Sequence, residues 1–131
     1  HVYCCGPGPL MDAVASAGTD RPSSSVNFER FSAEGATGDA AADGAFRIKL
    51  SRKGATWTVP AGRSILQTLE DNGVELPCSC REGLCRTCET PLLAGRADHR
   101  DFVLSEEERL SNTSIIICVS RALDDELVLD L

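Results

Sequence analysis

The chain has few basic residues and no long hydrophobic run. It carries 13 lysines and arginines against 20 aspartates and glutamates, which gives a formal net charge of −7. Phosphate binding requires a basic face, so nucleic acid is not expected as a partner. No apolar run approaches the roughly 18 residues of a membrane span, so no membrane partner is expected either. No segment resembles a secretory signal.

Cysteine, in contrast, is frequent, with seven residues among 131. An odd count without a secretory segment disfavours a disulfide framework. Many reduced thiols are typical of a reducing compartment, so we expect a cytoplasmic protein. The length supports one compact domain with additional segments.

Four of the cysteines have the spacing of a metal centre. Cys80, Cys85 and Cys88 form a C-x4-C-x2-C pattern, and Cys118 lies downstream in the apolar run Ile115–Val119. This is the spacing of a plant-type [2Fe–2S] cluster. Two irons that share two sulfides each need two further ligands, so four thiolates are required. A short loop can supply three of them while its backbone N–H groups face the cluster and tune its potential.

Two alternatives accompany this interpretation. A zinc-binding structural module without redox activity would also use thiolates, but it normally has paired C-x2-C knuckles, and the chain has only one. Cys78 lies beside the pattern, yet only Cys80 gives the four-residue interval to Cys85. We therefore expect Cys78 to be a non-ligand at the entrance of the loop.

Composition divides the chain into three parts. Residues 1–17 contain a β-prone stretch, a Gly/Pro turn and the start of a helix, too little to bury a core alone. We expect them to be the C-terminal remnant of a preceding domain of a longer polypeptide. Residues 18–45 are rich in Gly, Ala, Ser and Asp and are interpreted as an interdomain linker. Residues 46–131 form the globular domain.

The sequence pattern of residues 46–131 predicts several strands around one packed helix. Alternation of apolar and polar residues predicts the strands, and Ser64 is a plausible N-cap of the helix, with Gly73 after its end. Ser105 and Glu108 form a capping box that opens a short helical turn. This order predicts an α+β fold of the ubiquitin-like β-grasp type. The expected strands are 46–50, 56–59, 89–94, 115–119 and 127–131, and the expected helix covers 65–72.

Four further motifs follow the first three cysteines or include the fourth. They are Ala97-Asp-His-Arg-Asp101, Leu104-Ser-Glu-Glu-Glu-Arg109, Cys118-Val-Ser-Arg121 and Leu127-Val-Leu-Asp-Leu131. Together with the cysteine spacing, they resemble the C-terminal plant-type ferredoxin domain of the phthalate dioxygenase reductase family. The run Tyr3–Met11 is similar to the closing motif of a ferredoxin–NADP reductase type nucleotide domain.

The resemblance implies a role in electron transfer. In that family FMN-, NAD(P)H- and cluster-binding domains follow one another, and the parent protein is an NAD(P)H-dependent oxidoreductase. FMN takes two electrons as a hydride and releases them singly to the cluster. The acceptor would be a Rieske oxygenase component or a fused haem-thiolate monooxygenase domain. Cys5 would lie near the nicotinamide, and Cys80, Cys85, Cys88 and Cys118 would bind the cluster. The fragment itself would be an electron carrier without catalytic residues.

Two positions leave alternatives open. Members of the family usually have Gly at the position of Arg86. The arginine charge would favour the reduced cluster and raise its potential if the guanidinium stays near, or the side chain points into solvent and affects only a partner surface. The segment 98–101, Asp-His-Arg-Asp, forms either an ion-paired turn that fixes the domain or a contact for the flavin domain.

Overall fold

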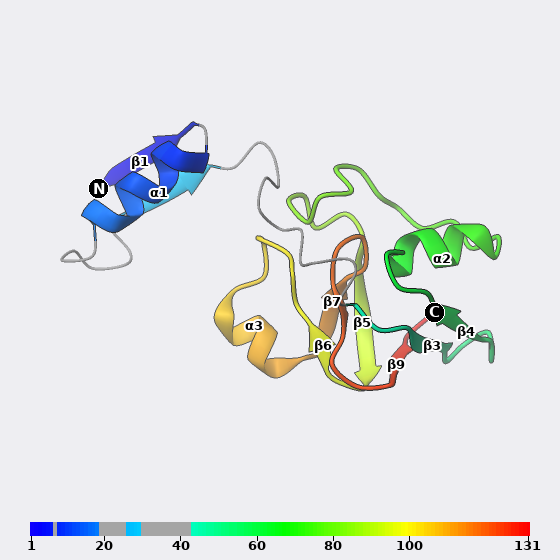
Figure 1. Ribbon diagram of the computed structural model, residues 1–131. Helices are drawn as coiled ribbons and strands as arrows, with labels where there is room; N and C mark the ends of the chain where they lie inside the picture. Colours follow the sequence, from blue (N-terminus) through cyan, green and yellow to red (C-terminus); the bar gives the residue numbers. More distant parts are fainter. Residues whose placement is uncertain (7, 19–25, 30–42) are drawn as a thin grey trace. The chain divides into compact units, whose positions relative to one another are not determined.

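The computed structural model describes residues 1–6, 8–18, 26–29 and 43–131 (Figure 1). The chain divides into two compact units, His1–Gly35 and Ala36–Leu131.

In the first unit, strands β1 (Val2–Cys5) and β2 (Val26–Glu29) pair in parallel, and helix α1 (Gly8–Ala17) lies between them in the sequence. Parallel neighbours require a crossover connection, which usually contains a helix. Cys4 of β1 and Met11 of α1 are buried. The described residues of the first unit therefore form a strand–helix–strand element.

Strand β2 lies inside residues 18–45, which we expected to be a linker. Its alternating apolar residues account for the strand, because Val26 pairs with Val2 and Phe28 pairs with Cys4. Apart from Phe31, the rest of residues 18–45 are small or polar, and pairing with a neighbouring strand accounts for β2.

A five-stranded sheet forms the second unit, in the order β4-β3-β9-β5-β7. The pair β3–β9 is parallel, whereas β3–β4, β5–β9 and β5–β7 are antiparallel. The expected strands 46–50, 56–59 and 89–94 are confirmed. The sheet consists of β3 (Phe46–Leu50), β4 (Thr56–Val59), β5 (Glu89–Ala94), β7 (Ser114–Ile116) and β9 (Glu126–Leu129).

Helix α2 (Ile65–Asp71) buries its apolar face in the same core as the sheet. As predicted, Ser64 is the N-cap, and it forms a capping box with Gln67 through two hydrogen bonds of 3.0 Å. Gly73 follows the helix with φ +78°, a left-handed conformation that glycine adopts without strain. Ile65, Leu66 and Leu69 are fully buried. A mixed sheet with one helix packed against it confirms the predicted α+β, β-grasp fold.

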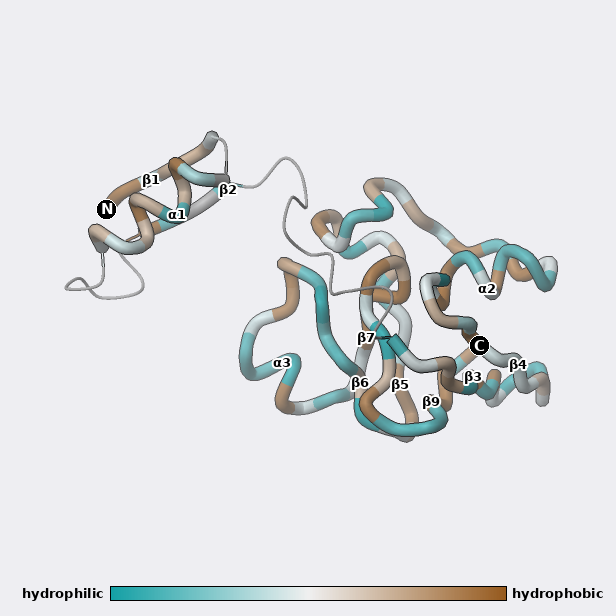
Figure 2. The backbone as a smooth tube through the Cα atoms, viewed as in Figure 1, coloured by the Kyte–Doolittle hydropathy of each residue, from teal (hydrophilic) through white to brown (hydrophobic). Residues whose placement is uncertain are grey.

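Two smaller elements complete the second unit. Strands β6 (Ala97–Asp98) and β8 (Arg121–Ala122) form a separate antiparallel pair. Helix α3 (Glu106–Ser111) begins after the predicted capping box of Ser105 and buries none of its residues. Its polar composition is visible in Figure 2. No helix within the described ranges is long and apolar enough to cross a membrane.

The prediction of a strand over 115–119 was wrong at its C-terminal end. Strand β7 ends at Ile116, and Cys118 lies in the turn that follows. The backbone N–H groups of Val119 and Ser120 both point to the carbonyl of Ile116, at 3.4 and 3.0 Å, which closes a turn. The carbonyl of Ile117 instead accepts a hydrogen bond of 3.0 Å from Leu66 of α2. The chain therefore leaves the sheet two residues before the cysteine.

The last strand is also shorter than predicted, since β9 covers Glu126–Leu129 and not 127–131. After Leu129, the N–H of Asp130 donates to the carbonyl of Pro91 at 3.1 Å. The carboxylate of Asp130 pairs with the guanidinium of Arg52 at 2.7 Å. The polar end of the chain is held by these contacts outside the strand.

Candidate metal centre

The four predicted ligand cysteines lie at one end of the sheet. Cys80 and Cys85 belong to the irregular loop between α2 and β5, and Cys88 directly precedes β5. Cys118 follows β7. Strand β7 pairs with β5 in antiparallel orientation, and Glu89 lies opposite Ile116. The end of β5 that carries Cys88 therefore adjoins the end of β7 that carries Cys118.

The thiols of these cysteines lie close enough to interact. Cys88 interacts most strongly with Cys118 and Cys85 forms hydrogen bonds with Cys80, while smaller repulsions act between Cys118 and Cys80 and between Cys88 and Cys85. The hydrogen bond between Cys88 and Cys118, followed by burial, raises the pKa of the Cys118 thiol. The same bond lowers the pKa of Cys88 to about 7. The pKa of Cys85 is lowered to about 6, first by the hydroxyl of Thr87 and then by the backbone and thiol of Cys80. Cys88 and Cys118 are buried, whereas Cys85 is exposed.

Backbone N–H groups of the loop point at the sulfurs. Glu82 and Leu84 both donate to Sγ of Cys80 at 3.3 Å. The backbone N–H of Gly83 faces Cys118 and opposes the rise in the pKa of that thiol. Arg81 and Arg86 have φ values of 58° and 60°, and such turns aim successive N–H groups into an anion-binding concavity. Donors of this kind stabilise thiolates and the negative charge of an iron–sulfur cluster.

Gly83 is required by its surroundings. Its φ is +77°, and a Cβ atom there would lie 2.8 Å from Cγ2 of Val119 and 3.1 Å from Cα of Asp101. Both the backbone conformation and the lack of space demand glycine. The loop consequently approaches the turn after Cys118 as closely as the backbone allows.

We expect Gly83→Ala to destabilise the chain by about 1–3 kcal/mol, the usual cost of a strained backbone conformation, and to lower the iron bound per chain. Urea denaturation and iron analysis measure the two effects. Gly54→Ala is the control, because Gly54 has φ +65° but nothing within 4 Å of its Cβ position. Equal iron content and equal midpoints in the two variants would contradict a need for the close approach at Gly83.

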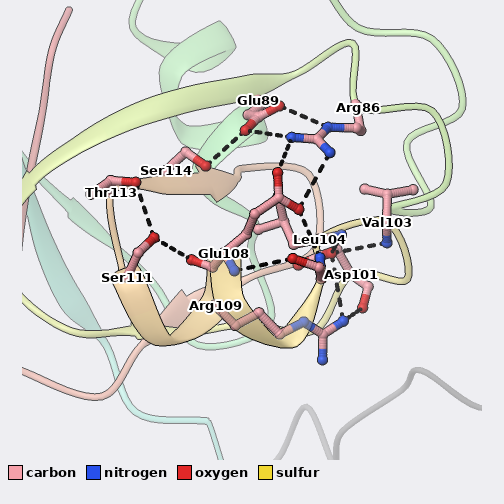
Figure 3. Close-up of polar contacts among 11 residues, drawn as sticks. Arg86, Glu89, Asp101, Val103, Leu104, Glu108, Arg109, Ser111, Thr113 and Ser114 are labelled. Carbon is pink, nitrogen blue, oxygen red and sulfur yellow. Dashed lines mark hydrogen bonds and ion pairs between the residues drawn. The ribbon is translucent and has the colours of Figure 1, made fainter.

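A buried carboxylate supports the loop from the other side. Oδ2 of Asp101 accepts hydrogen bonds from the N–H groups of Val103 and Leu104, at 3.0 and 2.8 Å, and lies 3.6 Å from the guanidinium of Arg109 (Figure 3). The N–H of the following residue, Phe102, donates to the carbonyl of Gly83 at 3.0 Å. Asp101 thus fixes the segment that holds the cluster loop.

The segment 98–101 forms the ion-paired turn that was one of its two predicted roles. The guanidinium of Arg100 lies 2.7 Å from the carboxylate of Asp98 and 2.7 Å from that of Asp43. Asp43 belongs to the stretch that precedes β3, so this pair also attaches the start of the second unit to the turn.

Arg121 is a structural residue that sequence reasoning missed. Its side chain is 8% exposed and donates to the carbonyls of Arg63, Gly44 and Pro60. The guanidinium lies over the ring of Phe46, 5.0 Å from its centroid. Together with Cys118 it lines a cavity of about 260 Å³. The motif Cys118-Val-Ser-Arg121 contains this residue, but no pattern in it indicates burial.

Cys78 and Cys5 lie outside the four-cysteine pattern. Cys78 is half-buried against the hydrophobic core, and its thiol interacts with the guanidinium of Arg81. Its place outside the ligand set stays a prediction. Cys5 ends β1 in the first unit and is exposed. Its position near a nicotinamide stays a prediction.

The thiols fit a two-iron cluster in number. The two irons of a [2Fe–2S] cluster together need four protein thiolates, and Cys80, Cys85, Cys88 and Cys118 would supply them. Within the described residues, no three His, Cys, Asp or Glu side chains converge as ligands of a single ion.

Comparisons with known proteins agree with this geometry. Residues 48–123 match the family described as 2Fe-2S iron-sulfur cluster binding domain. The chain is 49% identical over 132 residues to the phthalate dioxygenase reductase of Burkholderia cepacia, an alignment that covers 100% of this chain and 39% of that protein.

Two solved structures are also similar. One is a phthalate dioxygenase reductase, described as a modular structure for electron transfer from pyridine nucleotides to [2Fe–2S], with a TM-score of 0.76, 48% identity, and coverage of 100% of this chain and 40% of that one. The other is an intact type IV self-sufficient cytochrome P450 monooxygenase, with a TM-score of 0.88 and 36% identity, covering 100% of this chain and 17% of that one. The chain therefore spans about two fifths of the length of the reductase that it resembles.

Proposed function

The chain belongs to the family of 2Fe-2S iron–sulfur cluster binding domains, and we propose that Cys80, Cys85, Cys88 and Cys118 hold such a cluster and that the chain transfers single electrons through it. The match of residues 48–123 to that family carries this proposal, and within the described residues no three His, Cys, Asp or Glu side chains converge on a single point. A site for one tetrahedral zinc ion would bring all four sulfurs to a single point. We therefore favour the redox function over the zinc-binding alternative.

The residues around the cysteines would stabilise the negative charge of a bound cluster and control its exposure to solvent. A bound [2Fe–2S] cluster accepts and releases one electron at a time, at about −400 mV in plant-type ferredoxins. The N–H groups of Glu82, Gly83 and Leu84 stabilise the negative charge at the sulfurs. Buried Cys88 and Cys118 exclude water from one side, and exposed Cys85 leaves the other side open to redox partners. No substrate pocket and no catalytic residue is needed.

We further propose that the chain is part of a larger NAD(P)H-dependent reductase. In this proposal residues 1–17, with strand β2, close an NAD(P)-binding domain in which Cys5 lies near the nicotinamide. The rest of residues 18–45 is the linker, and residues 46–131 form the ferredoxin domain. FMN in a preceding domain supplies the electrons. The match of the whole chain to 40% of a reductase that transfers electrons from pyridine nucleotides to [2Fe–2S] supports a place in a larger reductase.

The acceptor that we propose is an oxygenase. Relatives include reductases of dioxygenase systems and a self-sufficient cytochrome P450, so the acceptor is either a Rieske centre in a separate component or a haem domain fused to the same polypeptide. In both cases the acceptor must approach the exposed side of the loop, 79–87, because electron transfer needs proximity to the cluster edge.

Metal and sulfide analysis tests the proposed function. We expect the chain, purified anaerobically, to be red-brown and to contain two iron and two acid-labile sulfide per chain, as a [2Fe–2S] cluster requires. Titration with dithionite should bleach the visible absorption with uptake of one electron. A colourless chain that contains zinc, and that binds no iron after reconstitution with iron and sulfide, would contradict the proposal.

A further inference from the structure

Arg86 has an unusual backbone conformation for a residue with a long side chain. It lies between the ligands Cys85 and Cys88 with φ +60°, a region that favours glycine. Such conformations persist in residues other than glycine only where the surrounding contacts fix them. The side chain of Arg86 should therefore make contacts that compensate for the strain.

The guanidinium of Arg86 forms two forked ion pairs (Figure 3). Its Nε and Nη2 donate to the two oxygens of Glu89 at 3.0 and 3.1 Å. Its Nη2 and Nη1 donate to the two oxygens of Glu108 at 2.9 and 3.4 Å. Such bidentate pairs hold both partners in a defined geometry. Arg86, Glu89 and Glu108 form an ion triad.

The ion triad links the cluster loop to the elements that carry or flank the ligands. Glu89 begins β5 directly after Cys88 and accepts a hydrogen bond of 2.7 Å from the hydroxyl of Ser114 in β7. Glu108 belongs to the capping box of α3 and accepts a hydrogen bond of 2.7 Å from the N–H of Ser105. One guanidinium thus connects the loop, two strands and a helix.

The triad carries a net negative charge. One arginine and two glutamates are ionised at neutral pH, so the charge beside the loop is −1. The sequence suggested either a charge that raises the potential if the guanidinium stays near or a side chain in solvent. The side chain is 42% exposed, and its charge is paired with two carboxylates. Without Arg86, two carboxylates would stand beside the cluster uncompensated.

We propose that Arg86, Glu89 and Glu108 position the cluster loop and adjust the reduction potential through their net negative charge. The proposal rests on the proposed function, since it requires a cluster in the loop. Reduction adds a negative charge to the cluster, so each further negative charge nearby disfavours it. Arg86 is a positioning residue in this scheme. The hydrogen bonds of its guanidinium compensate for the cost of its left-handed backbone conformation, which glycine would adopt without strain.

Two substitutions should move the midpoint potential in opposite directions. Arg86→Met leaves both carboxylates uncompensated, so the potential should fall. Glu108→Gln removes one negative charge and keeps an acceptor for the capping box, so the potential should rise. Both shifts should shrink at high ionic strength, because the three side chains are 28–42% exposed. Spectroscopic redox titration of the holo chain at low and high salt measures them.

Two further variants separate charge from geometry. Arg86→Lys keeps the charge, so the potential should remain near that of the parent chain. An ammonium cannot form both forks, so the chain should lose iron to a chelator faster. Arg96→Met is the control, because Arg96 pairs with Asp124 at 2.6 Å beyond the opposite end of β5. It should change neither the potential nor the rate of iron loss.

The outcomes distinguish this inference from the proposed function. Opposite shifts for Arg86→Met and Glu108→Gln, with no shift for Arg96→Met, support it. Shifts of the same sign, or no shift at low salt in chains that contain the full cluster, would overturn it. Absence of iron and sulfide from the unsubstituted chain would instead refute the proposed function.

Discussion

Cys88→Ala and Cys118→Ala should each abolish the visible absorption and most of the bound iron, whereas Cys78→Ser should leave both unchanged. Cys88 and Cys118 are 4% and 9% exposed, and their thiols interact with each other. Loss of either sulfur leaves one iron with a single protein ligand. Because the vacated space is buried, water cannot readily supply the missing ligand. Iron and sulfide analysis together with visible spectroscopy measures the loss.

Cys78 is the matched control, since it lies two residues before the proposed ligand Cys80. Its thiol contacts the guanidinium of Arg81 and the edge of the core. A serine at position 78 keeps a small polar group beside Arg81 without touching the ligand set. A normal spectrum in Cys88→Ala, or loss of iron in Cys78→Ser, would refute the assignment of ligands.

Local patterns predicted most of the secondary structure in the second unit. Along β3, Phe46, Ile48 and Leu50 are buried and the two residues between them are exposed, as the alternation indicates. The capping boxes of Ser64 and Ser105 depend on side chains three residues away, so a short window contains the whole signal. Three of the four cysteines lie within nine residues, so their spacing can be recognised in a short stretch of sequence. The fourth could be identified only because one further cysteine occurs downstream of them.

Features that depend on distant residues could not be predicted. The strand over 115–119 ends early because the carbonyl of Ile117 turns to α2, which the apolar run does not encode. Arg86 was a departure from the family pattern, but its partner Glu108 lies 22 positions away. Strand β2 consists of four residues whose pairing requires β1. In each case the deciding contact joins segments that are far apart in the sequence.

Arg121→Met is expected to destabilise the second unit by about 3–5 kcal/mol, the usual cost of breaking a buried ion pair. The guanidinium lies 3.5 Å from the carboxylate of Asp43 and donates to three backbone carbonyls. Methionine retains most of the apolar contact with Phe46 but none of the donors. The carbonyls of Gly44 and Pro60 then lose a charged partner at 3.0 and 3.3 Å, so the stretch before β3 should detach from the turn after Cys118.

The urea midpoint of the holo chain, followed by circular dichroism, and the lifetime of its visible absorption measure this effect. Arg47→Met is the matched control, because Arg47 is 60% exposed and its pair with Glu126 spans 3.5 Å. Exposed pairs of this kind contribute about 0–1 kcal/mol. Arg121→Lys should recover only part of the loss, since an ammonium cannot reach carbonyls from three segments. Equal midpoints for Arg121→Met and Arg47→Met would show that the buried guanidinium does not hold the cluster end of the domain together, and the order of the turn around Cys118 would then have to come from the sheet alone.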